Sequence, residues 1–216
     1  MDRSTTASSG SGFGASFSEL VSRTEGLQPW RRVFHAVSGL VLALAPGALG
    51  LESTETAAIL AVAAVLLFAS DAFRLRSPAA NRLFFVVFRT LASPREAAGL
   101  ASSSWYALGA AIVWAAVPGE PAVAALLVLG LADPAASVVG RSWGRRPLGK
   151  GSWVGSITFA VVAFAVLLGV LPWPLAAVVA GVAAAFEVAP LGVDDNLTIP
   201  LVTGAFVWAL QNLPPG

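Results

Sequence analysis

Seven long apolar runs dominate the sequence and restrict the kind of fold that it can adopt. They are bounded by proline, glycine or charged residues and cover residues 33–51, 56–72, 105–117, 121–139, 154–171, 173–190 and 197–213. A helix crosses the hydrocarbon core of a bilayer in about 20 residues. Only 12% of the residues are charged, against about 25% in soluble domains. The runs therefore predict an all-α fold, a polytopic membrane helix bundle of about seven transmembrane helices, and exclude a large soluble domain.

The distribution of charge predicts the orientation of this bundle. Basic residues lie before the first run, between the second and third, and between the fourth and fifth: Arg31, Arg32, Arg74, Arg76, Arg82, Arg89, Arg95, Arg141, Arg145, Arg146 and Lys150. The opposite connections hold Glu52, Glu55 and Glu120 and no basic residue. Because cytoplasmic loops retain lysine and arginine, we expect a cytoplasmic N-terminus, an external C-terminus and a location in the cytoplasmic (inner) membrane.

Two segments outside the runs have their own character. Residues 1–28 are rich in serine, threonine and glycine and are predicted to form a disordered cytoplasmic tail, which leaves 29–216 as the integral membrane domain. The alternative for the tail is an amphipathic interfacial segment around Phe13, Phe17 and Leu20. Residues 81–89 are apolar, flanked by arginine and too short to cross, so we expect an interfacial helix there. The chain has no cysteine, which excludes disulfides, thiolate metal sites and a cysteine nucleophile.

Asp133 lies inside the fourth apolar run, about 10 Å below the predicted helix end at 1.5 Å per residue. A carboxylate at that depth is costly unless it is paired, wetted or bound to a cation, so it predicts a functional site. Pro134 follows directly and predicts a kinked or broken helix beside the carboxylate. Asp71 is the weaker candidate, because it lies three residues before Arg74 and the two side chains can equally form an ion pair.

Two polar segments near Asp133 on the cytoplasmic side suggest a phosphate site and a metal site. The loop 140–156 alternates glycines with arginines and a lysine, a pattern that suits phosphate binding but also suits an ordinary cytoplasmic loop. Asp194, Asp195 and Asn196 lie between the last two runs. Adjacent hard oxygen ligands suit Mg²⁺, whereas helix capping is the alternative explanation. The single histidine, His35, lies one turn inside the first run and is either a base or a satisfied interfacial side chain.

Four motifs resemble those of the membrane-embedded CTP-dependent lipid kinases, the family of dolichol kinase, phytol kinase and CTP-using diacylglycerol kinase. They are RRVFH at 31–35, RE at 95–96 before WYALG at 105–109, DPAASVVGR at 133–141, and DDNLTIP at 194–200. The last two are the most specific. The sequence departs from the family at 150–156, where KGSWVGS replaces Lys-Ser-x-Glu-Gly-Ser, and at Ala132, where a glycine is usual.

The resemblance implies that the γ-phosphoryl group of CTP is transferred to a lipid hydroxyl, an isoprenoid alcohol or diacylglycerol, with Mg²⁺ as cofactor. The implied partners are CTP, a membrane lipid alcohol and the bilayer, with no nucleic acid, and the oligomeric state stays open, a homo-oligomer included. The implied metal ligands are Asp133, Asp194 and Asp195. Catalytic roles fall to Asp133, Asp195, Glu187, His35 and Glu96. Nucleotide contacts fall to Ser137, Gly140, Arg141, Gly144, Arg145, Lys150, Ser152, Gly155 and Asn196.

Three other functions share some of these features. A CTP:phosphatidate cytidylyltransferase would use the same nucleotide and metal, but its Ser-Pro-Lys-Lys-Thr and Pro-Gly-His-Gly-Gly segments have no counterpart here. A transporter would also place carboxylates near broken helices, yet the predicted external half has no inward-facing ionisable group. A purely structural membrane protein leaves the clustering of charge unexplained.

Overall fold

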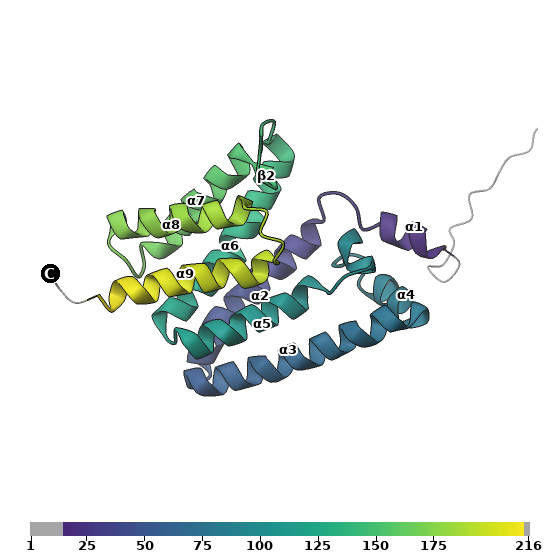
Figure 1. The fold of residues 1–216 in the computed structure, drawn as a ribbon, viewed down its shortest axis with the longest axis horizontal. Helices are drawn as coiled ribbons and strands as arrows, with labels where there is room; N and C mark the ends of the chain where they lie inside the picture. The colour runs from purple at the N-terminus through teal and green to yellow at the C-terminus, as the bar shows by residue number, and fades with distance from the viewer. Residues whose placement is uncertain (1–14, 214–216) are drawn as a thin grey trace, which may run out of the picture.

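The structure, a computed structural model, describes residues 15–213, and this part of the chain is helical except for one short hairpin (Figure 1). The elements in chain order are α1 (Phe17–Ser22), α2 (Pro29–Ala48), α3 (Ser53–Arg76), α4 (Pro78–Val87), the 3₁₀ turn η1 (Pro94–Ala97), α5 (Ser102–Ala116), α6 (Glu120–Trp143), the strands β1 (Pro147–Leu148) and β2 (Gly151–Ser152), α7 (Trp153–Leu167), α8 (Trp173–Val188) and α9 (Asp195–Gln211). The predicted all-α class is confirmed.

Each of the seven apolar runs corresponds to one helix, namely α2, α3 and α5 to α9. Judged by length and composition within the described residues, α3 and α6 are long and apolar enough to cross a membrane. The predicted interfacial segment 81–89 also forms a helix, α4, which begins three residues earlier because Ser77 caps it and Pro78 occupies its first turn.

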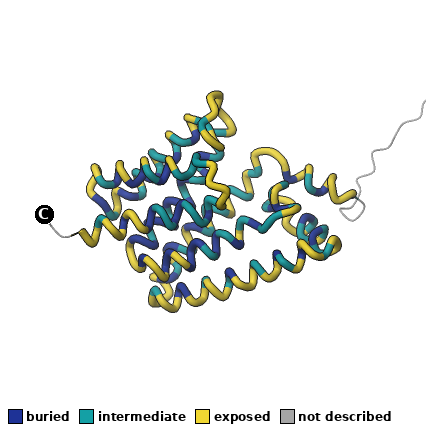
Figure 2. The backbone as a smooth tube through the Cα atoms, in the orientation of Figure 1, coloured by how far each residue is buried: buried dark blue, intermediate teal, exposed yellow. Residues whose placement is uncertain are grey.

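Helix α6 forms the centre of the bundle, and α2, α7 and α9 pack around it. Helix α3 packs against α5 on the outside of the bundle. Figure 2 shows that the surface of α3 is largely exposed, whereas many residues of α6 are buried. Small residues bring the helices together. A Cβ atom on Gly39 of α2 would lie 2.5 Å from the Cα of Gly130 of α6, so the two backbones touch where these helices cross. This crossing places the polar ends of α2 and α6 side by side.

The polar loops gather at one end of the bundle, where capping side chains begin several helices. Ser152 accepts a hydrogen bond from the Gly155 amide at 3.2 Å and starts α7. Asp194 accepts one from the Asn196 amide at 3.0 Å and starts α9. Each cap satisfies an amide that would otherwise lack a partner in the first turn. The capped ends hold the chain segments that surround the main cavity.

Two expectations from the sequence need correction. Helix α6 is not broken at Pro134, since it runs as one helix from Glu120 to Trp143 with the proline inside. Asp133 therefore projects from the side of an uninterrupted helix, α6. The predicted disorder of residues 1–28 does not extend to 15–28, which include α1 and pack on α4 through the buried Leu20 and Phe85. Residues 1–14 lie outside the described part of the chain.

Candidate active site

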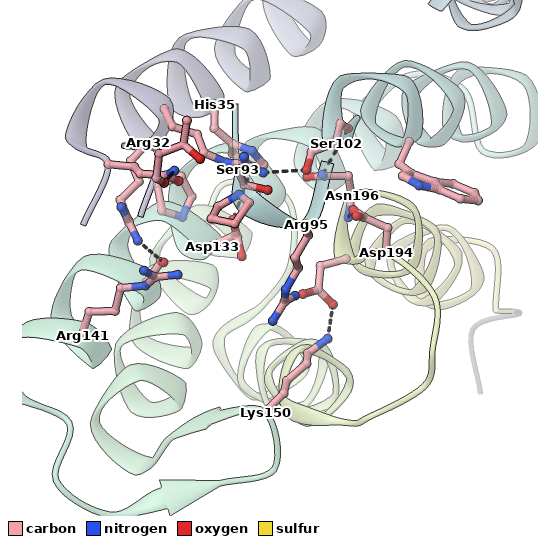
Figure 3. Close-up of a pocket in the computed structure, with 18 of the residues that line it drawn as sticks. Arg32, His35, Ser93, Arg95, Ser102, Asp133, Arg141, Lys150, Asp194 and Asn196 are labelled. Carbon is pink, nitrogen blue, oxygen red and sulfur yellow. Dashed lines mark hydrogen bonds and ion pairs between the residues drawn. The ribbon is translucent and has the colours of Figure 1, made fainter. Parts of the chain in front are cut away.

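A cavity of about 840 Å³ opens at the polar end of the bundle. Figure 3 shows side chains from α2, α6, α9 and the segment before α5 gathered around it. Its lining is rich in charged groups, both cationic and anionic: Glu25, Arg31, Arg32, His35, Arg95, Asp133, Arg141, Lys150, Asp194 and Asp195. Of the predicted site residues, the cavity brings together His35, Asp133, Ser137, Arg141, Lys150, Asp194, Asp195 and Asn196. Elements distant in sequence thus meet at one site.

Arg32 has buried donor nitrogens that lack a partner. Its Nη2 donates to the Ser137 hydroxyl at 2.8 Å, whereas its Nε and Nη1 are buried and have no hydrogen-bond partner within residues 15–213. Buried donor nitrogens without a partner are costly unless an anion completes them. Arg32 therefore marks the place in the cavity best prepared for an anionic group.

Asp133 faces His35 across the crossing of α2 and α6. The two side chains approach to 3.6 Å between His35 Nε2 and Asp133 Oδ2, and the same nitrogen lies 3.3 Å from the carbonyl oxygen of Leu129. The imidazole stacks on the Tyr106 ring, with centroids 4.7 Å apart. Since two oxygen acceptors face Nε2, this nitrogen carries the proton in the neutral ring. His35 is thus packed between the Tyr106 ring and α6, with its Nε2 facing the Asp133 carboxylate.

The first turn of α9 supplies a second acidic group to the cavity. Asp195 forms an ion pair with Lys150, which reaches it from the turn between β1 and β2. Both Asp194 and Asp195 precede the apolar run that begins at residue 197. Burial raises the pKa of Asp195 to about 6, although Lys150 opposes the shift, and burial also raises the pKa of Asp194. A bound cation would stabilise the ionised form of both carboxylates.

The glycines of the basic loop pack helices together and do not line the cavity. A Cβ atom on Gly140 would lie 3.3 Å from the Cα of Gly155 and 3.0 Å from the Ser152 hydroxyl oxygen. A Cβ atom on Gly144 would lie closer still to the same oxygen. These four predicted nucleotide contacts join the end of α6 to the start of α7, and Arg145 is exposed outside the cavity lining. Lys150 and Arg141 are the cations of this region that reach the cavity.

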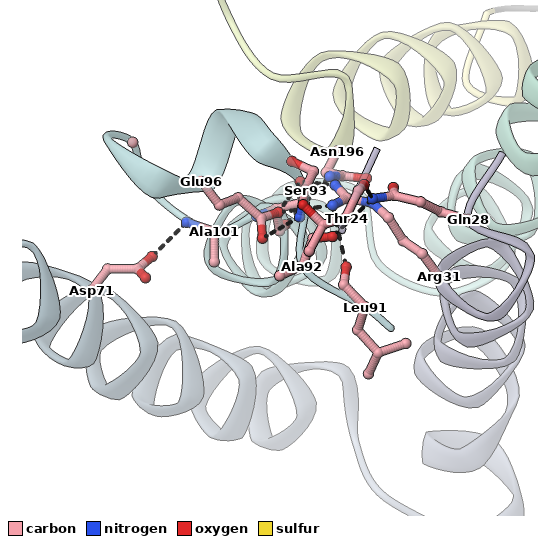
Figure 4. A network of polar contacts seen from close by, with 12 residues as sticks. Thr24, Gln28, Arg31, Asp71, Leu91, Ala92, Ser93, Glu96, Ala101 and Asn196 are labelled. Atoms are coloured by element: carbon pink, nitrogen blue, oxygen red, sulfur yellow. Dashed lines mark hydrogen bonds and ion pairs between the residues drawn. The ribbon is translucent and has the colours of Figure 1, made fainter. Parts of the chain in front are cut away.

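Glu96 is buried, with 5% of its surface exposed, and its oxygens are occupied by structural contacts. Its Oε1 lies 3.1 Å from Arg31 Nη1 and accepts hydrogen bonds from the amide and hydroxyl of Ser102. Its Oε2 accepts a bond from the Ser93 amide at 3.2 Å. Figure 4 shows this network beside the cavity. The geometry makes Glu96 the group that ties α2 to η1 and α5.

Asp71 and Arg74 form the ion pair that was one of the two alternatives for Asp71. Arg74 Nε donates to Asp71 at 2.6 Å, and its Nη1 and Nη2 donate to the carbonyls of Glu96 and Gly99 at 2.7 and 2.8 Å. Asp71 Oδ2 also accepts a bond from the Ala101 amide at 2.8 Å. Because every member has a partner, this buried network fixes the segment 93–101 that lines one side of the cavity.

Glu187 ends α8 close to the cavity without lining it. Its Oε2 is buried and, within the described residues, has no hydrogen-bond partner. In residues 15–213 no three acidic or histidine side chains come close enough to enclose a metal ion. A magnesium ion needs less than that, because it commonly takes one or two carboxylates and completes its coordination with water and phosphate oxygens. Asp194 and Asp195 fit such an open site.

The cavity contains residues that the sequence analysis did not assign to the site. Thr24, Glu25, Gly26 and Gln28 line it from the N-terminal side, and Arg141 Nη1 donates to the Gly26 carbonyl at 2.7 Å. The segment was missed because a polar stretch without periodicity is typical of a tail. Arg32 was visible in the RRVFH motif, but its unpaired nitrogens follow only from the packing of α2 on α6.

A comparison with curated proteins finds similarity to the "CTP-dependent diacylglycerol kinase 1" of Schizosaccharomyces pombe. The two sequences are 26% identical over 202 residues, which cover 84% of this chain and 92% of that protein. This similarity confirms the resemblance to CTP-dependent lipid kinases that the four sequence motifs indicated. No protein-family model and no solved structure matches the chain.

Proposed function

We propose that the protein is a CTP-dependent lipid kinase that transfers the γ-phosphoryl group of CTP to the hydroxyl of diacylglycerol in the membrane. The observation that carries the proposal is the cavity itself. It combines the half-buried guanidinium of Arg32, two of whose nitrogens lack a partner within the described residues, with the carboxylates of Asp133, Asp194 and Asp195 at the polar end of an apolar bundle. Phosphoryl transfer depends mainly on positioning and on neutralising charge, and the cavity offers groups for both.

The proposal includes a bundle of seven membrane-spanning helices with its cavity on the cytoplasmic side of the inner membrane. Large apolar side chains are exposed along α2, α3 and α7, as lipid contact requires. Exposed tryptophans stand near the helix ends at both extremes of the bundle: Trp30, Trp143 and Trp153 near the cavity end and Trp173 and Trp208 at the other. Tryptophan is enriched at both membrane interfaces, and the basic loops lie at the cavity end.

In this proposal the CTP triphosphate binds to the cations of the cavity. Arg32 supplies the two unpaired nitrogens, and Arg141 and Lys150 supply further positive charge. Mg²⁺ would be held by Asp194 and Asp195 together with phosphate oxygens, and it would neutralise charge on the phosphates. Lys150 already compensates Asp195 through their ion pair. These residues bind and orient the nucleotide.

The transfer step falls to Asp133. Its carboxylate accepts the proton of the acceptor hydroxyl while the hydroxyl oxygen bonds to the γ-phosphorus. The bond from that phosphorus to the bridging oxygen breaks, so CDP leaves and the products are CDP and a lipid monophosphate. His35, protonated on Nε2 and stacked on Tyr106, orients the carboxylate. General base catalysis of this kind typically contributes about 10² to 10⁴ to the rate.

Diacylglycerol is the acceptor that the similarity favours, since the relative is named for it. Isoprenoid alcohols such as phytol or a polyprenol present the same hydroxyl on a different hydrocarbon. The test is to incubate purified protein and Mg²⁺ with γ-labelled or α-labelled CTP over diacylglycerol, phytol, polyprenol and phosphatidic acid. Label in diacylglycerol from γ-CTP alone is the expected result. Lipid label from α-CTP with phosphatidic acid would identify a cytidylyltransferase and overturn the proposal.

A further inference from the structure

A second, smaller groove lies on the outer side of α2. It has a volume of about 330 Å³ and is lined by Trp30, Val33, Phe34, Val37, Thr90 and Leu91. The first four occupy positions i, i+3, i+4 and i+7 of α2 and therefore share one helix face. Large apolar side chains on this face are exposed, with 53% of the Phe34 surface accessible. The groove is thus a shallow, open apolar depression along the start of the helix.

The groove and the large cavity share one wall. Arg31 lines the cavity, and its Nη1 donates to the carbonyl oxygen of Leu91, which lines the groove, at 3.2 Å. Figure 4 shows the Leu91 side chain pointing away from the polar network that holds its carbonyl. The same two turns of α2 therefore present Arg31, Arg32 and His35 to the cavity on one face and apolar side chains to the groove on the other.

We infer that the groove formed by these six residues binds one acyl chain of the acceptor lipid. The inference rests on the proposed function and specifies where the substrate lies. A diacylglycerol must bring its hydroxyl to Asp133 while its chains stay in an apolar environment. Arg31, which lines the charged cavity, and Leu91, which lines the apolar groove, are joined by a hydrogen bond and form the boundary between the two. A chain in the groove would leave the glycerol portion at that shared wall.

The occupant is a hydrocarbon chain because the groove offers little to a polar ligand. Apart from the Thr90 side chain, its lining side chains are aliphatic or aromatic. It lies at the N-terminal end of α2, where the proposed membrane interface meets the cavity, and not in the middle of a lipid-facing helix. A lipid whose hydroxyl must reach the interface can enter from the side there without passing through the charged cavity.

The direct test uses the full chain in detergent micelles with a diacylglycerol that carries a photoreactive diazirine near the end of one acyl chain. After illumination, the cross-linked peptides are mapped by mass spectrometry. Cross-links concentrated in residues 29–37 and 88–91 are expected, and an excess of unlabelled diacylglycerol should suppress them. Cross-links spread evenly over the exposed apolar surfaces of α2, α3 and α7 would overturn the inference. This readout does not require turnover.

A paired substitution tests the same site through kinetics. Val37→Trp fills the groove and should lower the specificity for long-chain over dioctanoyl diacylglycerol by about fivefold or more, because overpacking excludes the longer chain. Val62→Trp on α3 is the matched control, since this valine is also exposed (60%, against 51% for Val37) and lies outside both cavities. If the two variants have the same chain-length specificity, the inference that the groove binds an acyl chain is refuted, whereas the kinase proposal still stands. Absence of γ-phosphoryl transfer in the wild type would instead reject the kinase proposal.

Discussion

Arg31 and Arg32 are adjacent in the sequence, yet the fold gives them opposite surroundings. Arg31 is bound by Glu96, Ser102 and the carbonyl of Leu91. Arg32 has one bond, to Ser137, and two buried nitrogens that have no partner in the described part of the chain. Consecutive positions of a helix point about 100° apart, so one guanidinium turns toward the η1 segment and the other toward α6. Arg31 therefore joins α2 to η1 and α5, and Arg32 is the arginine to which the proposed function assigns the nucleotide phosphates.

Alanine substitution should separate these two roles. Arg32→Ala should raise the KM for CTP by about tenfold or more, as the loss of a charge-assisted contact predicts, with little change in thermal stability. Arg31→Ala should leave the buried Glu96 without its cation and destabilise the fold by about 2 kcal/mol, or roughly 4–8 °C in Tm. Steady-state kinetics and thermal unfolding in detergent measure both effects. An Arg32 variant with wild-type KM would refute its phosphate role.

Asp133 is argued to be the base, and its isosteric amide tests that role. Asp133→Asn preserves the size of the side chain at the α2–α6 crossing but cannot accept the hydroxyl proton, so kcat should fall by about 10² to 10⁴. Unfolding of the variant in detergent should remain cooperative. The control is Glu120→Gln, an exposed carboxylate at the opposite end of the bundle that should retain full activity. Wild-type turnover in the Asp133 variant would remove this residue from the mechanism.

The sequence predicted the residue types of the cavity better than their roles. Asp133 was identifiable because a carboxylate inside an apolar run is costly unless it has a partner, whereas Asp194 also has the capping role that the sequence offered as the alternative. The packing roles of Gly140, Gly144 and Gly155 could not be identified. In a sequence, a glycine that contacts a phosphate group cannot be distinguished from a glycine that lets a neighbouring helix pack closely. The sequence also did not show the structural contacts of Glu96. Its partners Arg31 and Ser102 lie 65 and 6 positions away, and only the fold brings the three side chains together.

At the scale of elements, the crossing of α2 and α6 sets the geometry of the site. Gly39 lies one turn after His35 on α2, and Gly130 lies one turn before Asp133 on α6. The contact between the two glycine backbones therefore determines how closely His35 approaches Asp133, at 3.6 Å, and Arg32 approaches Ser137, at 2.8 Å. The apolar runs predicted both helices, but not their depth of contact, which requires knowing which glycines meet.

A single methyl group at this crossing should impair activity. The Cβ atom of Gly130→Ala would lie 2.8 Å from the Cα of Gly39, so the helices must separate. A misplacement of about 1 Å can cost about 10² in rate, and overpacking of this kind costs about 1–3 kcal/mol in stability. Gly181→Ala in α8 is the control, because its Cβ would meet nothing within 4 Å. It should be neutral or slightly stabilising, as alanine favours helix. Equal activity of the two variants would show that the crossing does not position the site.

The elements that could not be predicted from the sequence are those that lack a periodic pattern of apolar residues. Helix α1 has only six residues, and Thr24 to Gln28 follow it as irregular chain that reaches the cavity. Pro134 led to the opposite error, the prediction of a helix break where there is none, because a proline normally disrupts a helix. Helix α6 continues through Pro134, with neighbouring helices packed on both sides. Local signals predict where helices start and stop, but tertiary packing decides whether an exception is tolerated.

At the scale of the whole molecule, the fold concentrates charge at one end and exposes apolar side chains along the helices. This polarity is what a membrane-embedded kinase needs, because CTP arrives from water while the acceptor and its product stay in the bilayer. Two crossings separate each basic connection from the next, so the first four apolar runs must all span the membrane for the basic connections to share one side. The same pattern places the cavity on that side, and one experiment can test both the proposed count of seven and the position of the cavity.

The absence of cysteine from the native chain makes that experiment direct. Single-cysteine variants at Thr54, Ser142 and Asn212, all at exposed positions, would be treated with a membrane-impermeant maleimide in intact spheroplasts. Thr54→Cys, before the α3 apolar run, and Asn212→Cys, after α9, should react at once. Ser142→Cys, in the basic region beside the cavity, should react only after permeabilisation. Labelling of the residue 54 and 212 variants on opposite sides would contradict seven crossings. Immediate labelling of the Ser142 variant would place the cavity outside the cytoplasm, where CTP is not supplied, and would remove the kinase proposal with the topology.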